Sequence, residues 1–181
     1  MAVASINYRL TQEAPFPAQT EDCKKAIDFL KKNSLFLDLE VNQTSAVGLS
    51  AGGHLAIMLA ASNSVDKAVS YGAPVDLKQK LARKHHRQTL EALIGGPLAD
   101  NLDKLEAASP VSQFHGAAGE LLIFHGQGDR TIPYTEAIKL TKAVAKSQNT
   151  VTLSLIPDGS HTTVGGPEGW KQLVQFLNPR S

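Results

Sequence analysis

Short apolar segments alternate with longer amphipathic segments along most of this chain. The segments of strand length lie at 2–8, 44–49, 67–72, 121–124 and 151–156. Residues 121–124 are wholly apolar and residues 2–8 largely so, which predicts buried strands. Residues 151–156 instead alternate apolar and polar side chains, and this pattern favours a strand near the edge of a sheet.

The amphipathic segments predict helices. They lie at 20–32, 51–62, 133–147 and 167–177. Thr20 is the expected N-cap of the first helix, and Lys31 and Lys32 in its last turn suit the negative end of the helix dipole. Pro133 and Pro167 are expected to open the last two helices, because proline fits the first helical position. In the final helix, one face is predicted to consist of Trp170, Leu173, Val174 and Leu177.

Alternating strands and helices indicate the α/β class, with a parallel sheet covered by helices. We expect a single domain over residues 1–181 with about five mainly parallel strands. The alternation is lost at 78–118, where short helical pieces at 88–94 and 103–107 are separated by Gly and Pro. An insertion of this kind is expected to lie over one end of the sheet and to shape a pocket.

Composition excludes several classes of protein. The chain carries a formal net charge of +1, and its one basic cluster, at 83–87, is expected to be a solvated helix face, so nucleic acid is not an expected partner. The single cysteine, Cys23, excludes a disulfide framework and falls at helical spacing with Ile27, which predicts a core position. No apolar run approaches the roughly 18 residues of a membrane span, and no secretory signal opens the sequence. We therefore expect a soluble cytoplasmic protein with no membrane partner.

A Gly-x-Ser-x-Gly pentapeptide stands where the strand at 44–49 meets the next helix, as Gly48-Leu49-Ser50-Ala51-Gly52. A strand–turn–helix junction is the context in which such a serine is presented as a nucleophile. The turn is strained, and Gly48 and Gly52 are expected to supply the small neighbours it needs. The helix N-terminus behind Ser50 also favours developing negative charge.

Two more polar side chains follow predicted strands. Asp129 follows the fourth strand through a Gly-rich turn, and His161 follows the fifth. Because the carboxyl ends of parallel strands meet at one edge, we expect Ser50, Asp129 and His161 to lie together, and their order along the chain is that of α/β-hydrolases. Asp76 and Asp158 are rival acids, and Asp129 ranks first because its long turn can carry it beneath an imidazole.

These residue types predict acyl transfer to a serine. A serine hydroxyl is a poor nucleophile until His161 accepts its proton, while Asp129 would hold the other ring N–H. The backbone N–H of Ala51 would donate to the oxyanion of the tetrahedral intermediate. No metal or cofactor is predicted, and the remaining histidines are expected to be structural or surface residues: His54, His85, His86, His115 and His125.

Several motifs together make the chain resemble α/β-hydrolase esterases. They are Asn7-Tyr8-Arg9-Leu10, the segments 14–19, 48–56 and 124–129, and Ala108-Ser109-Pro110. Over essentially its whole length the chain is most similar to the bifunctional feruloyl/acetyl-xylan esterase-like (BD-FAE) and hormone-sensitive-lipase-like groups. This resemblance implies a carboxylic-ester hydrolase with Ser50, Asp129 and His161 as nucleophile, acid and base. Its implied substrates are small molecules, either short-chain acyl esters or esters of acetylated or feruloylated sugars.

The sequence departs from these groups at one point. Their members carry a His-Gly-Gly loop before the Asn-Tyr-Arg strand, and this sequence begins at that strand. The resemblance therefore implies an N-terminally shortened α/β-hydrolase fold in which Ala51 lacks the usual further oxyanion donors. It also implies an uncovered apolar edge at residues 2–8, and because such edges promote association we expect a homodimer.

Two other functions fit parts of the pattern. Prolyl-oligopeptidase-like peptidases share the serine turn and the order of the three residues, but the sequence shows no propeller or other gating domain. A catalytically weak chain that acts as a binding or scaffold module would explain the missing loop. It would not explain why Ser50, Asp129 and His161 are all present.

Overall fold

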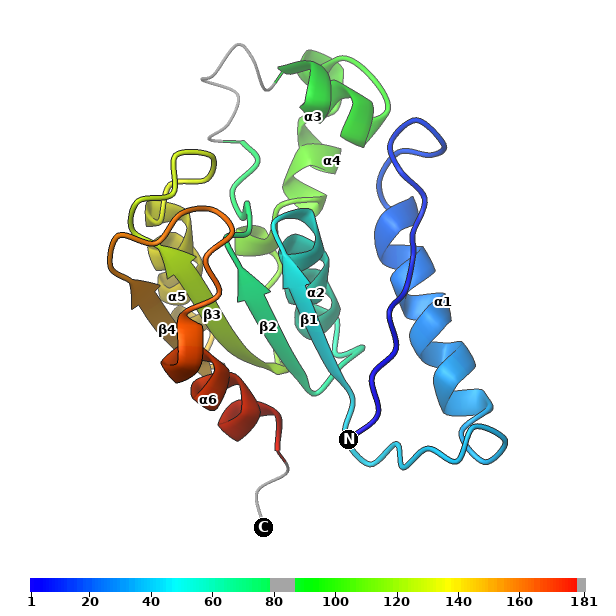
Figure 1. The fold of residues 1–181 in the computed structure, drawn as a ribbon. Coiled ribbons are helices and arrows are strands. Elements are labelled where there is room, and N and C mark those ends of the chain that lie inside the picture. Colours follow the sequence, from blue (N-terminus) through cyan, green and yellow to red (C-terminus); the bar gives the residue numbers. More distant parts are fainter. Residues whose placement is uncertain (79–86, 179–181) are drawn as a thin grey trace. The chain divides into compact units, whose positions relative to one another are not determined.

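The computed structural model describes residues 1–78 and 87–178, which fall into two compact units (Figure 1). Unit 1 consists of Met1–Gln43 and Leu77–Ser109, and unit 2 of Thr44–Asp76 and Pro110–Ser181. His85, His86 and all of the basic cluster except Arg87 lie outside the described residues. The prediction of one domain with a pocket-shaping insertion stays a prediction.

The sheet of unit 2 has four parallel strands in the order β1-β2-β3-β4. The strands are β1 (Ser45–Leu49), β2 (Lys67–Tyr71), β3 (Glu120–Gly126) and β4 (Val151–Ile156). Each strand pairs with the next one along the chain, so that Val47 lies opposite Val69 and Val69 opposite Leu122. The predicted α/β class is therefore confirmed, and β4 lies at an edge of the sheet as its alternating sequence indicates.

The prediction of a buried strand at 2–8 is wrong. Residues 2–7 are exposed and outside any strand or helix, and the side chain of Val3 is 88% exposed. Apolar composition is not sufficient for a strand, because backbone N–H and C=O groups need a neighbouring strand to pair with. The described sheet thus has four strands rather than about five, and residues 2–8 present no strand edge for a dimer. The homodimer itself stays a prediction.

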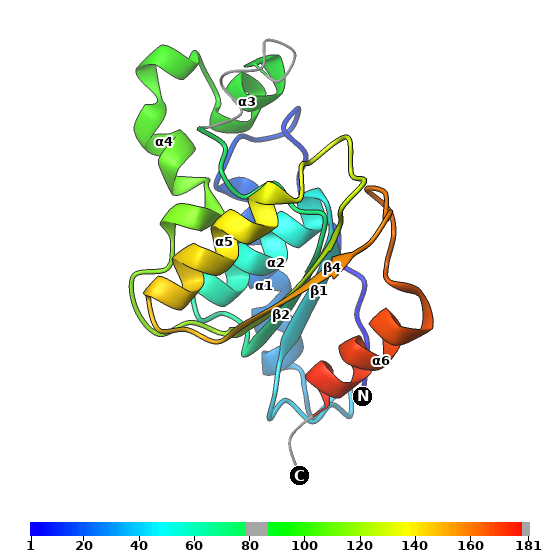
Figure 2. The same ribbon diagram turned by 90° about the vertical axis from the view of Figure 1, so that its left-hand side faces the viewer.

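Helices cover both faces of the sheet in unit 2 (Figure 2). On one side lie α2 (Ala51–Ala61) and α5 (Thr135–Lys146), and on the other lies α6 (Gly166–Leu177). The short 3-10 turn η4 (Pro110–Ser112) precedes β3. Although α2 is apolar on all sides, none of the helices in the described part of the chain is long and apolar enough to cross a membrane. A cytoplasmic location stays a prediction.

The face beneath α6 is an apolar cluster that spans three strands. Its buried members are Val69, Tyr71, Leu122, Phe124 and Leu173, and Ile156, Phe176 and Leu177 pack against it. The Tyr71 and Phe124 rings stack with their centroids 4.8 Å apart. Trp170, predicted to face this core, is 66% exposed, because Gly169 and Leu173 are the buried positions of α6.

Unit 1 contains α1 (Ala18–Lys32), α3 (Arg87–Ile94), the 3-10 turn η3 (Leu98–Asp100) and α4 (Leu102–Ala107). The helical pieces predicted at 88–94 and 103–107 are therefore confirmed, and Cys23 is buried as expected. Thr20 is not the N-cap of α1, because Pro17 holds that position and the Pro17 carbonyl accepts the N–H of Glu21. The core of this unit consists of Leu77, Leu90, Ile94, Leu98, Leu105 and Ala108.

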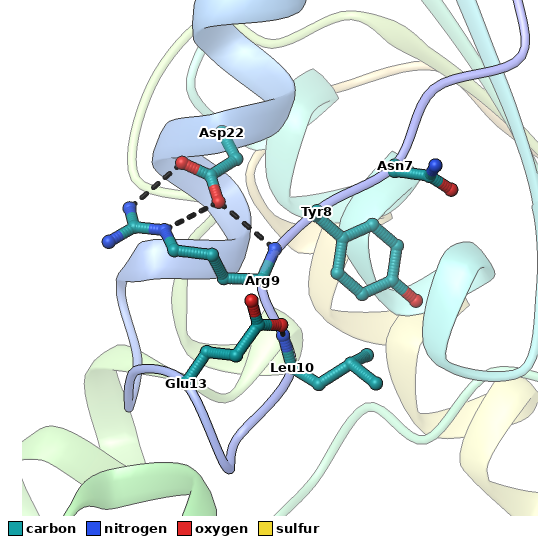
Figure 3. Close-up of a pocket in the computed structure, with 6 residues that line it drawn as sticks. All are labelled: Asn7, Tyr8, Arg9, Leu10, Glu13 and Asp22. Atoms are coloured by element: carbon teal, nitrogen blue, oxygen red, sulfur yellow. Dashed lines mark hydrogen bonds and ion pairs between the residues drawn. The ribbon is translucent and has the colours of Figure 1, made fainter.

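An ion pair ties the N-terminal segment of unit 1 to α1 (Figure 3). The Arg9 guanidinium donates to both carboxylate oxygens of Asp22 at 2.8 Å, and the Arg9 backbone N–H donates to the same carboxylate at 3.0 Å. Figure 3 shows Tyr8 and Asn7 pointing away from this pair. Hydrogen bonds from the Arg9 side chain and backbone lower the pKa of Asp22 from its ordinary 3.8 to about 2.

Replacing Asp22 by asparagine is expected to destabilise the protein at neutral pH but not in strong acid. A carboxyl group with a depressed folded-state pKa stabilises the fold above its unfolded pKa and loses that contribution as the pH falls through the folded value. The urea midpoint of Asp22→Asn should lie below that of the unaltered protein at pH 7, and the gap should close between about pH 4 and pH 2. Glu21→Gln is the matched control, since its carboxylate lies 3.9 Å from the guanidinium and should give the smaller gap. An Asp22→Asn gap that does not change with pH would contradict this account.

Candidate active site

Ser50 is the single residue between the end of β1 and the start of α2. Its φ of 54° and ψ of −115° are strained for a residue with a Cβ atom. The backbone on both sides holds this conformation, because Ser50 N–H donates to the Tyr71 carbonyl at 2.8 Å and Ser50 C=O accepts the N–H of His54 at 3.0 Å. The hydroxyl is therefore carried on a turn whose geometry the neighbouring strand and helix define.

The glycines that this turn needs are not quite those predicted. A Cβ atom on Gly48 would lie 2.1 Å from backbone atoms of Gly52, and one on Gly53 would lie 2.9 Å from the Ser70 hydroxyl oxygen. A Cβ atom on Gly52 itself would meet no described heavy atom within 4 Å. The expectation that Gly52 supplies a small neighbour is wrong, because its missing side chain would point into open space. Gly48 and Gly53 have that role.

The structure brings Ser50, His161 and Asp129 together, at the carboxyl ends of β1, β4 and β3. His161 Nε2 lies 3.0 Å from Ser50 Oγ, and His161 Nδ1 lies 2.7 Å from Asp129 Oδ2. The Asp129 side chain is fully buried, while that of His161 is 21% exposed. The rival acids lie elsewhere, since the Asp76 carboxylate accepts from Lys139 Nζ at 2.7 Å and Asp158 is exposed.

The Asp129 carboxylate is surrounded by donors. The backbone N–H groups of Thr131 and Ile132 donate to Oδ1 at 2.8 Å and 2.9 Å, and His161 donates to Oδ2. Burial alone raises the pKa of Asp129, but the hydrogen bonds from Ile132, His161 and Thr131 outweigh it and lower the pKa below its ordinary value. The carboxyl group is thus an anion at neutral pH, which is the form that can orient an imidazole.

Close contacts between glycines hold the two loops that carry these side chains. A Cβ atom on Gly126 would lie 2.2 Å from the Gly159 carbonyl oxygen, and the Gly128 N–H donates to the same oxygen at 2.9 Å. Gly72, just after β2, has a φ of +56°, and a Cβ atom there would lie 3.2 Å from His161 Nδ1 and 3.4 Å from Asp129 Oδ2. Gly72 was not among the predicted site residues, although a glycine at the end of a predicted strand is a visible signal.

Ala51 is the first residue of α2 and is exposed beside Ser50. The first backbone N–H groups of a helix have no carbonyl acceptor in a preceding turn, so they are free to face an anion. Ala51 therefore has a suitable position for an oxyanion donor, and that role stays a prediction.

Three of the remaining histidines lie within the described residues. His54 is buried with Nδ1 3.1 Å from the Pro74 carbonyl, and His115 is exposed, as expected for structural and surface residues. His125 is buried beside Asp129, at 3.3 Å from its Oδ2, which the sequence analysis did not anticipate. Within the described ranges, no group of three or more His, Cys, Asp or Glu side chains is placed to hold a metal ion.

The two glycines of the pentapeptide should differ sharply when replaced by alanine. Gly48→Ala forces a Cβ atom into backbone and should destabilise the protein by about 3 kcal/mol or more, the upper range for overpacking. Gly52→Ala adds a good helix former in open space and should raise the free energy of unfolding by up to about 1 kcal/mol. Urea titration of both variants tests the pair, and equal losses would show that both positions are tightly packed.

The sequence is similar to those of known proteins. The chain matches the BD-FAE family over residues 1–144. It is 28% identical over 176 residues to esterase LipQ of Mycobacterium tuberculosis, a match that covers 87% of this chain and 41% of LipQ. The chain therefore spans less than half the length of this curated relative.

Solved structures show the same fold. A truncated form of a carbohydrate esterase from gut microbiota has a TM-score of 0.84 at 22% identity, covering 95% of this chain and 71% of that one. A bifunctional GH43-CE protein of Bacteroides eggerthii has a TM-score of 0.86 at 26% identity, covering 95% of this chain and 26% of that one. Esterase Est2 of Thermogutta terrifontis has a TM-score of 0.76 at 20% identity, covering 94% of this chain and 68% of that one. With the α/β-hydrolase fold shared by these esterases and a family match over most of its length, the chain belongs to the BD-FAE family.

Proposed function

We propose that this protein hydrolyses carboxylic esters through an acyl-enzyme formed on Ser50. The observation that carries the proposal is the continuous line of contacts from Ser50 Oγ to His161 Nε2 at 3.0 Å and from His161 Nδ1 to Asp129 Oδ2 at 2.7 Å. A hydroxyl, an imidazole and a buried carboxylate in this order are the parts of a Ser-His-Asp triad.

In the first half of the reaction, Ser50 Oγ attacks the acyl carbon while its proton passes to His161 Nε2. The tetrahedral intermediate then collapses, and the leaving alkoxide takes that proton as it departs as the alcohol. In the second half, His161 removes a proton from water, the hydroxide attacks the acyl-enzyme, and Ser50 regains its proton as the acid leaves. Asp129 stabilises the imidazolium in both halves, and its lowered pKa keeps it ionised throughout.

The Ala51 N–H is our proposed donor to the oxyanion. It lies at the N-terminus of α2, where the helix dipole also favours negative charge. Loss of one oxyanion donor costs about 2.7–4 kcal/mol in other serine hydrolases, so the Ala51 N–H would contribute strongly to the rate.

The proposed substrates are short-chain acyl esters or esters of acetylated or feruloylated sugars. Membership of the BD-FAE family and the relation to esterase LipQ support an ester substrate.

Ser50→Ala is expected to remove the activity. Hydrolysis of p-nitrophenyl acetate should fall at least about a thousandfold, because the nucleophile is lost while binding is retained. A fluorophosphonate probe should label the unaltered protein and leave the variant unlabelled. Parallel assays with p-nitrophenyl butyrate and an aminoacyl-p-nitroanilide separate an esterase from a peptidase. Undiminished labelling of Ser50→Ala would move the nucleophile to another residue, and no turnover of any substrate would favour a binding module.

Asp129→Asn and Asp76→Asn should differ by orders of magnitude in kcat. In a serine protease the corresponding change costs about 10⁴-fold, because the amide stabilises the wrong imidazole tautomer. Asp76→Asn removes a partly exposed ion pair with Lys139 that does not involve His161, and kcat should change by less than about twofold. The reverse ranking would identify Asp76 as the acid.

A further inference from the structure

A second histidine lies behind the triad and has no part in the mechanism above. His125 is the penultimate residue of β3 and is only 1% exposed. Its Nε2 lies 3.3 Å from Asp129 Oδ2, the oxygen that contacts His161 Nδ1. Two imidazoles therefore approach one carboxylate oxygen, one from the side of Ser50 and one from the core of the sheet.

The contacts of His125 define its tautomer. Nε2 lies 2.9 Å from the Ile132 carbonyl oxygen, and because a carbonyl can only accept, Nε2 must carry the hydrogen. Nδ1 is buried and has no hydrogen-bond partner among the described residues. A neutral ring with its hydrogen on Nε2 meets both conditions. A protonated ring would bury a second N–H without an acceptor, which is unfavourable.

Ile132 couples this ring to the carboxylate. Its N–H donates to Asp129 Oδ1 at 2.9 Å, and its carbonyl accepts from His125. The carboxylate consequently accepts from two backbone N–H groups at Oδ1, from Thr131 and Ile132, and from His161 at Oδ2, while the hydrogen on His125 Nε2 goes to the Ile132 carbonyl. With donors on both oxygens, the carboxylate has no freedom to rotate out of line with His161.

We propose that His125 is a positioning residue of the triad: its Nε2–H holds the Ile132 carbonyl, and with it the turn whose N–H groups keep Asp129 in line with the Nδ1–H of His161. This inference rests on the proposed function of Ser50, Asp129 and His161. Because His125 is buried behind the carboxylate, it acts through Asp129 and never on the substrate. Its loss should therefore lower kcat and leave KM nearly unchanged.

The alternative is that His125 only fills space in the core, and two substitutions of similar size distinguish the roles. His125→Gln keeps an amide N–H where Nε2–H stood, whereas His125→Met keeps the volume and has no donor. Leu122→Val is the control for lost packing, because Leu122 is buried in the same strand and belongs to the cluster under α6.

The experiment measures kcat and KM for p-nitrophenyl acetate with urea midpoints for each variant. We expect His125→Met to lose about 2- to 10-fold in kcat, the range for one hydrogen bond between neutral groups, with KM within about twofold. His125→Gln should recover most of that loss, and Leu122→Val should keep kcat despite a lower midpoint. Unaltered kcat in a folded His125→Met, or equal losses in the Gln and Met variants, would overturn the proposal.

A measurement on the unaltered protein covers the case in which a variant does not fold. Nitrogen NMR of the histidine rings at pH 7 should show His125 neutral, with its hydrogen on Nε2. A hydrogen on Nδ1 or a charged ring would overturn the proposal without any activity assay. Failure of the triad itself would show separately, as turnover that survives in Ser50→Ala.

Discussion

The buried charge of Asp129 is the constraint that organises the carboxyl edge of the sheet. An isolated carboxylate is costly to remove from water, so it must be surrounded by donors. Thr131 and Ile132 provide backbone donors because the turn after β3 folds back on its own aspartate, and His161 donates to the other oxygen. His125 supports that turn by donating to the Ile132 carbonyl. Residue 72 must also be glycine, because a side chain there would crowd both His161 and Asp129.

Strain at Ser50 is the second feature of this edge, and it is sustained by the packing around it. A positive φ for serine costs of order 1–3 kcal/mol. The cost is offset because β1 and α2 are fixed by the sheet and by the burial of Gly53 to Ala60. Gly48 can then approach the backbone of Gly52 more closely than any side chain would allow. Stability of the sheet and exposure of the hydroxyl are therefore linked.

The side chains of β1 are partly exposed, in contrast to the fully buried side chain of Asp129. This strand pairs only with β2 among the described residues, and Val47 and Leu49 are 52% and 42% exposed. Both lie in register with Val69 and Tyr71 of the cluster under α6, so their face of the sheet is apolar and only partly covered. Apolar surface left in water forgoes about 25 cal/mol per Å² of stabilisation, so this face contributes less to the core than the face under α6.

The sequence by itself determined four strands and the serine turn, because periodicity and strand ends are local properties. It also indicated that Ser50, Asp129 and His161 lie close together, because each of them follows a strand. It did not determine that residues 2–8 would form no strand, since pairing depends on a neighbour distant in the chain. It also assigned Trp170 to the core, whereas α6 turns Gly169 to the sheet. Only the tertiary structure decided the surroundings of Asp129, where β3 contributes His125 and Gly126, Gly72 follows β2 and Gly159 follows β4. Residue spacing carries no record of such contacts, because they depend on how strands lie beside one another and on how closely two backbones can approach.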